Sequence, residues 1–252
     1  MIKFLKRLII LILPLLIMYV SILQILGANI PAEVENYSSF ILEIKKSKVK
    51  QSLHRLYELG LEAQSKIDGS FDKKTYELIC RKMEGFQSFP YDQNEYEPGI
   101  YLDPDYFLNL ASNKGIKEDI IFFELYKKTK PSGLFSSYIA QQTDYSGCYL
   151  YGNGLMVELY ENWSSFANSY PNTKVYKNFA SKVISDIERV LTSNTPCVCK
   201  NKGSYVHELQ YFIKKFPDSK LVHKLKTLIN KAEKGYFDSI TEPRKIFYCH
   251  SG

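Results

Sequence analysis

The sequence lacks the short motifs that mark the common enzyme classes. It has no Gly-x-Ser-x-Gly elbow, no phosphate-binding loop and no dinucleotide-binding fingerprint, and it contains only four histidines. His207-Glu208 begins like the helical zinc-protease motif, but the second histidine that this chemistry requires is replaced by Tyr211. We therefore predict a non-enzymatic protein with no catalytic residues, no cofactor and no metal site.

Charged side chains are absent from one long stretch near the N-terminus. Residues 8–32 carry none, and three cations precede them. The apolar run over residues 8–26 would nearly cross a hydrocarbon layer of ~30 Å at about 1.5 Å per helical residue. We interpret residues 1–32 as a signal-anchor or a signal peptide, and the cationic flank predicts that the remaining chain is exported.

Two fates of this segment stay open. Left uncleaved, it would make a single-pass inner-membrane protein with its C-terminal domain in the periplasm. Cleavage after Gly27-Ala28 or Ala32 would instead give a periplasmic or secreted protein. A buried core helix is a third alternative, which an apolar surface on every side of the helix disfavours. Both leading interpretations place the chain in the cell envelope.

No long block of basic residues is present either. The chain has a net charge of +6, but beyond the first 32 residues 30 basic side chains face 27 acidic ones. The lysines are interleaved with acids along stretches of helical period, which is typical of solvated helix faces. We therefore predict no nucleic-acid partner.

Helical periodicity dominates the chain after the apolar run. Apolar residues recur every three or four positions from Tyr37 to Tyr57, and Asp103-Pro104 is a helix start that Gly115 would end. We predict a mainly α fold with irregular aromatic loops. Its parts are the targeting segment (1–32), an N-terminal helical region (33–132) and a C-terminal helical-hairpin repeat region (133–252), the last two either separate or one continuous domain.

Two stretches have no steady period: residues 86–102, with two prolines and three tyrosines, and residues 133–154, with four glycines and four tyrosines. We interpret the first as an aromatic surface loop and the second as either a short strand pair or coil. Because interfaces favour tyrosine, we predict an unidentified protein partner that binds exposed loop tyrosines, with core packing as the alternative for each. The candidates are Tyr91, Tyr96, Tyr101, Tyr149 and Tyr151.

An internal repeat occupies the C-terminal region. Residues 163–175 resemble residues 209–221 at an offset of 46, with Phe-x-x-x-Tyr-Pro-Asn-Thr in one copy and Phe-x-x-x-Phe-Pro-Asp-Ser in the other. Each copy predicts a helix that ends before the proline and a second helix capped by Asn172-Thr173 or Asp218-Ser219. Over residues 155–234 these phrases resemble tetratricopeptide-type hairpins of bacterial envelope proteins, which implies a TPR-like protein-binding scaffold. A generic pair of α-hairpins is the alternative.

All five cysteines follow the targeting segment, where an oxidising compartment would permit two disulfides and one thiol. A bridge from Cys148 to either Cys197 or Cys199 would join the two hairpins. Cys80 and Cys249 would pair or stay free. The alternative is a zinc site, although its spacing matches no common motif. It would draw on Cys197, Cys199, His207, Cys249 and His250.

Several function classes remain. The leading hypothesis is an exported or membrane-anchored, non-enzymatic protein-interaction module of the cell envelope. A narrower version is an inhibitor or immunity protein for an envelope-acting toxin, and a third class is a structural spacer. An enzyme would most simply be an envelope glycan hydrolase with two carboxylates about 5–10 Å apart. The acids available for that chemistry are Asp92, Glu95, Glu97, Asp144, Glu158 and Glu161.

Overall fold

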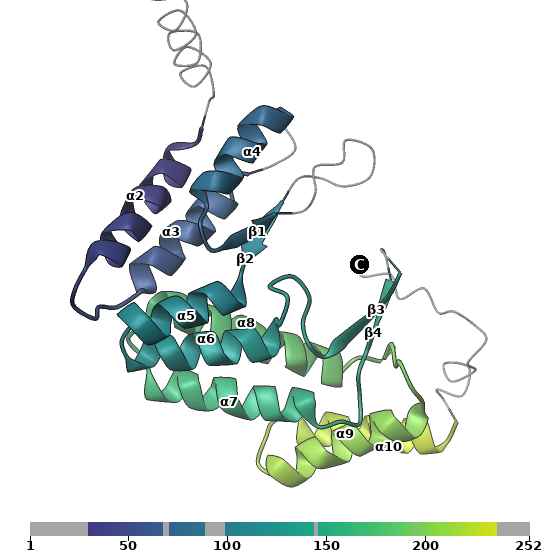
Figure 1. Cartoon of the computed structure of the whole chain (residues 1–252). Helices are drawn as coiled ribbons and strands as arrows, with labels where there is room; N and C mark the ends of the chain where they lie inside the picture. Colours follow the sequence, from purple (N-terminus) through teal and green to yellow (C-terminus); the bar gives the residue numbers. More distant parts are fainter. Residues whose placement is uncertain (1–29, 68–70, 89–98, 144–145, 195, 236–252) are drawn as a thin grey trace, which may run out of the picture. The chain divides into compact units, whose positions relative to one another are not determined.

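The computed structural model describes residues 30–67, 71–88, 99–143, 146–194 and 196–235 (Figure 1). This part of the chain contains nine helices and two small two-stranded sheets, so the protein is mainly helical, as the sequence predicts. Among these helices, none is long and apolar enough to cross a membrane. The predicted targeting run, residues 8–26, lies outside the described residues.

The chain divides into two compact units. Unit 1 comprises the described residues of 1–46 and 59–101, and unit 2 comprises those of 47–58 and 102–252. The sequence left open whether residues 33–132 and 133–252 are separate domains or one continuous domain. In unit 2 the ring of Phe122 stacks on Tyr176 with centroids 3.7 Å apart, so residues from both ranges share one core.

Unit 1 consists of helices and one short strand pair. The Asp72 side chain accepts the backbone N–H of Thr75 at 3.0 Å and so caps the start of the helix that follows it. Tyr37 meets the ring of Phe86 edge-on at 5.4 Å. The elements are α2 (Ala32–Lys46), the second half of α3 (His54–Gln64), α4 (Lys73–Lys82), β1 (Phe86–Ser88) and most of β2 (Ile100–Leu102).

Unit 2 continues with two helices, the first of which begins and ends where the sequence predicts. Asp103 accepts N–H groups of the first turn of α5 (Pro104–Lys114), Pro104 occupies that turn, and Gly115 ends the helix. The next helix, α6 (Lys117–Thr129), places Phe122 and Phe123 in an aromatic core. Trp163 is fully buried in the same core, and its indole N–H donates to Thr129 Oγ1 at 2.8 Å.

Two helix pairs complete unit 2: α7 (Leu155–Ser169) with α8 (Lys174–Leu191), and α9 (Lys202–Lys215) with α10 (Val222–Glu233). The first helix of each pair ends before its proline, as predicted. Thr173 is the N-cap of α8, also as predicted, but its hydroxyl donates to the Glu118 carboxylate and caps no backbone N–H of the helix. The predicted cap of the second pair is wrong. Helix α10 begins only after Leu221, beyond Asp218-Ser219.

Helices α7 and α9 run parallel to each other. Gly154 and Glu208 are hydrogen-bonded, Glu161 and Lys215 form an ion pair, and each pair is separated by 54 residues in sequence. Because the separation in sequence is the same at both contacts, the two helices must run in the same direction. Figure 1 shows the two helices running the same way within unit 2.

The stretch whose structure the sequence left open forms a strand pair. Strands β3 (Ile139–Thr143) and β4 (Ser146–Tyr149) are antiparallel, with Ile139 opposite Tyr149 and Ala140 opposite Cys148. Tyr149 also forms a parallel bridge with Val198, in the segment that connects α8 to α9. The backbone thereby brings Cys148 beside Cys199.

Candidate functional site

The structure places the predicted surface tyrosines in different environments. Tyr101 and Tyr149 are partly exposed. Tyr151 is only 1% exposed, and its hydroxyl donates to the Val190 carbonyl at 3.0 Å, so its prediction as a surface anchor is wrong. The ring packs inward because the hydroxyl finds this buried acceptor. Tyr91 and Tyr96 lie outside the described residues.

A disulfide joins Cys148 to Cys199, with Cα atoms 5.0 Å apart. This is one of the two pairings that the sequence left open. Cys197 is itself disulfide-bonded, whereas Cys80 carries a thiol. Cys249 lies outside the described residues. Oxidised sulfur is no thiolate ligand, so Cys197 and Cys199 do not supply the alternative zinc site.

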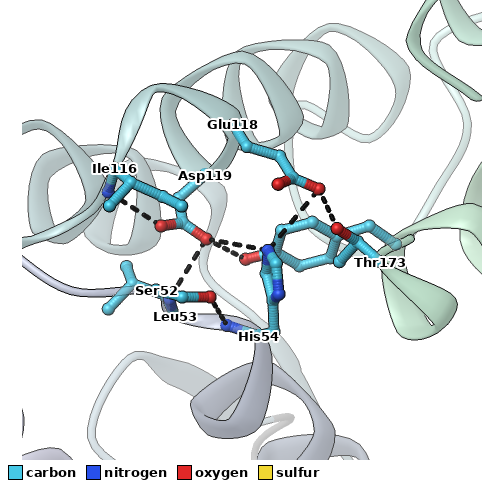
Figure 2. Close-up of polar contacts among 8 residues, drawn as sticks. Ser52, Leu53, His54, Ile116, Glu118, Asp119 and Thr173 are labelled. Atoms are coloured by element: carbon cyan, nitrogen blue, oxygen red, sulfur yellow. Dashed lines mark hydrogen bonds and ion pairs between the residues drawn. The ribbon is translucent and has the colours of Figure 1, made fainter. Parts of the chain in front are cut away.

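Asp119 is the centre of a buried polar cluster in unit 2 (Figure 2). Its side chain has no exposed surface. Oδ1 accepts the backbone N–H of Leu53 at 3.1 Å and the hydroxyl of Tyr176 at 2.8 Å, and Oδ2 accepts the N–H of Ile116 at 2.9 Å. One carboxylate thus ties together the 47–58 segment, the start of α6 and the first turn of α8.

His54 and Glu118 border this cluster. The His54 Nε2 atom is buried and lies 3.6 Å from Glu118 Oε1 and 3.7 Å from Asp119 Oδ1. Both distances exceed a hydrogen bond, so the imidazole attracts the carboxylates only when it is protonated. Its ring contacts Tyr176 edge-on at 4.5 Å, and Thr173 donates to Glu118.

The chemistry of this cluster is structural. Burial raises the pKa of the Tyr176 phenol well above its usual value, and the nearby Asp119 carboxylate raises it further. The phenol therefore stays protonated and remains a donor to Asp119. Because Asp119 and His54 Nε2 are buried, the atoms that would react are closed to a substrate. We interpret the cluster as a buried hydrogen-bond network that holds three segments together.

A pocket opens on the surface of unit 2 between the parallel helices α7 and α9. Its volume is about 480 Å³, within the range of roughly 300–1,000 Å³ that is typical of small-ligand sites. Residues 152–154 form one end. The side chains around it are Glu158, Glu161 and Asn162 from α7 and His207, Tyr211 and Lys215 from α9. We call this the α7–α9 pocket.

Glu208 fixes the end of the pocket formed by residues 152–154. Its buried Oε2 atom accepts the backbone N–H groups of Gly152 at 2.8 Å and Gly154 at 2.9 Å. Gly152 has a φ of +87°, and a Cβ there would come within 2.9 Å of the Ser204 backbone. Only glycine suits this position, because the turn combines a left-handed backbone with close contact to α9.

The charged side chains of the α7–α9 pocket are paired. Glu161 forms an ion pair of 2.9 Å with Lys215 across the two helices. Glu158 pairs with Lys128 of α6. Glu158 and Glu161 are two of the acids considered for glycan hydrolysis, and the structure brings both to one pocket. Each carboxylate, however, already has a lysine counterion.

Most of this pocket and the whole polar cluster could not be predicted from the sequence. Asp119 carried a partial signal, since an acid three residues after a helix start often binds the preceding backbone N–H. His54 and Tyr211 have no such signal, because no nearby residue in the sequence indicates which side chains they contact in the structure. Among the described residues, no group of three or more His, Cys, Asp or Glu side chains is arranged to hold a metal ion.

The chain matches no protein-family model, and neither a curated protein nor a solved structure shows significant similarity to it.

Proposed function

We propose that the protein is a non-enzymatic protein-interaction module of the cell envelope, exported by residues 1–32 and then anchored or released. The observation that carries this proposal is the pair of consecutive helical hairpins whose first helices, α7 and α9, run parallel. Stacked hairpins of this kind, including the tetratricopeptide type, present extended surfaces whose role is binding. The Cys148–Cys199 disulfide supports an oxidising compartment.

Partly exposed aromatic side chains are the best contacts for a partner protein. Phe135 is 44% exposed, which is unusual for a large apolar ring, and Tyr101 and Tyr149 are partly exposed. Aromatic residues are enriched at protein interfaces and supply much of their binding energy.

Site-specific photo-crosslinking tests the interaction. A photoreactive amino acid replaces Phe135, Tyr149 or Tyr101, one at a time, in the full chain expressed in its native host. The matched control replaces Glu43, an exposed residue of α2 outside the hairpins. We expect one protein adduct from at least one aromatic position and none from Glu43. The same adducts at Glu43, or none at any aromatic position, would contradict the proposal.

Export is tested separately on the same preparation. Fractionation locates the protein, and intact-mass analysis shows whether residues 1–32 are retained. A membrane fraction with an intact N-terminus supports the anchor, and an envelope fraction without it supports cleavage. Recovery in the cytoplasm would refute an envelope role even if a partner were found.

A glycan hydrolase is the second candidate, because Glu158 and Glu161 line the same pocket. Hydrolysis needs one carboxyl group that holds a proton and one that is ionised. Both acids are instead engaged in ion pairs, Glu158 with Lys128 and Glu161 with Lys215. The pairing therefore supports binding rather than proton transfer.

A further inference from the structure

We propose that the α7–α9 pocket binds a neutral saccharide and does not cleave it. The proposal is independent of the protein partner, because it rests only on the groups around the pocket. These groups select the ligand by charge, by hydrogen bonding and by shape.

The acidic and basic side chains around the pocket balance one another, so they favour no ionic ligand. The two carboxylates that line the pocket, Glu158 and Glu161, are each neutralised by a lysine. A phosphate or sulfate group would meet those carboxylates, and a cationic ligand would have to displace Lys128 or Lys215. A ligand without net charge is neither repelled by the carboxylates nor required to displace a lysine.

Hydrogen-bonding capacity favours a ligand with many hydroxyl groups. The Asn162 amide offers both donors and an acceptor, the carboxylates accept, and Lys215 donates. Sugar hydroxyls both donate and accept, so they match a lining of mixed character. An apolar ligand would instead strip these groups of water without replacing their hydrogen bonds.

Tyr211 supplies the aromatic surface that a sugar ring requires. It is half-buried on α9, and a Cβ placed on Gly154 would lie 3.1 Å from its ring. The missing side chain at Gly154 thus lets the ring rest beside the backbone at the start of α7. The ring contributes an apolar face within an otherwise polar pocket, suited to the C–H face of a sugar.

The pocket is also held in place before any ligand arrives. The Glu208 carboxylate binds the backbone N–H groups of Gly152 and Gly154, and the Glu161–Lys215 ion pair connects α7 with α9. Groups that are already positioned lose little entropy on binding.

Saturation-transfer NMR and calorimetry test the proposal on the full chain in detergent. The neutral probes are chitotriose, maltotriose, cellotriose and xylotriose, and a heparin disaccharide is the anionic comparison. We expect at least one neutral trisaccharide to bind with a Kd of about 0.1–10 mM and the anionic probe to bind more weakly. Tyr211→Ala should weaken neutral binding by about tenfold or more, equal to about 1.4 kcal/mol.

Two variants separate binding from folding. Tyr211→Phe keeps the ring and should retain most of the affinity. Tyr170→Ala removes a partly exposed tyrosine at the end of α7, outside the pocket, and should leave affinity unchanged. The proposal is overturned by stronger binding of the heparin disaccharide, by neutral binding that survives Tyr211→Ala, by no binding of any neutral probe, or by cleavage of a probe. None of these results bears on the crosslinking test of the protein partner.

Discussion

The Tyr176 hydroxyl donates a hydrogen bond of 2.8 Å to the buried carboxylate of Asp119, and this bond joins α8 to α6. Asp119 binds two backbone N–H groups as well, so its loss would leave three donors without their acceptor. Buried donors that lose their partner cost far more than an average hydrogen bond contributes.

Asp119→Ala should therefore lower the free energy of unfolding by about 3–5 kcal/mol. Tyr176→Phe removes one donor and leaves the carboxylate with its backbone partners, so the expected loss is smaller, about 1–2 kcal/mol. Urea titration of both variants measures the difference. A loss below about 1 kcal/mol for Asp119→Ala would show that the cluster does not hold unit 2 together.

The next prediction concerns Glu208, which fixes one end of the α7–α9 pocket. Glu208→Ala leaves the N–H groups of Gly152 and Gly154 unpaired, and we expect a loss of about 2–4 kcal/mol. Glu208→Gln keeps an acceptor oxygen and should lose less. The fluorescence of Trp163, the single tryptophan, reports unfolding of the same unit. Equal losses for the two variants would argue that charge, rather than the acceptor, matters at this position.

Local features of the sequence predict the helices well. The Asp103-Pro104 start, the Gly115 stop and the prolines after α7 and α9 act within a few residues, so they can be recognised without the tertiary structure. Thr173 shows where this approach fails. Its position predicts a cap, but its hydroxyl bonds to Glu118, which is 55 residues away in the sequence.

The candidate site depends on such distant contacts. Leu53 and Asp119 are 66 residues apart, and no periodicity links them. The sequence repeat has an offset of 46, whereas α7 and α9 contact each other at a separation of 54. Corresponding residues of the two copies are therefore displaced by about two helical turns, or roughly 12 Å. The repeat predicts both hairpins but not which side chains meet in the pocket.

The Cys148–Cys199 disulfide should stabilise unit 2 strongly. It closes a long loop, with a sequence separation of 51, and chain entropy predicts a contribution of about 4 kcal/mol. The double variant Cys148→Ser/Cys199→Ser should lower the melting temperature, and dithiothreitol should lower that of the native chain. Cys80→Ser is the matched control, because Cys80 is outside any disulfide. An unchanged melting temperature in the double variant would mean that the bridge adds no stability.

Cys80 should react slowly with alkylating reagents in the folded protein. Burial raises the pKa of its thiol, while hydrogen bonds with Tyr76 and Ser88 offset part of the rise. Since the thiolate is the nucleophile, a raised pKa lowers the reactive fraction at any pH below it. We expect iodoacetamide to modify Cys80 several-fold more slowly near pH 7.5 than in the guanidine-unfolded chain with its disulfides intact, and the rate to rise with pH through pH 9. Peptide mapping by mass spectrometry measures both rates. Equal rates in the folded and unfolded chains would show that α4 leaves this thiol open to solvent.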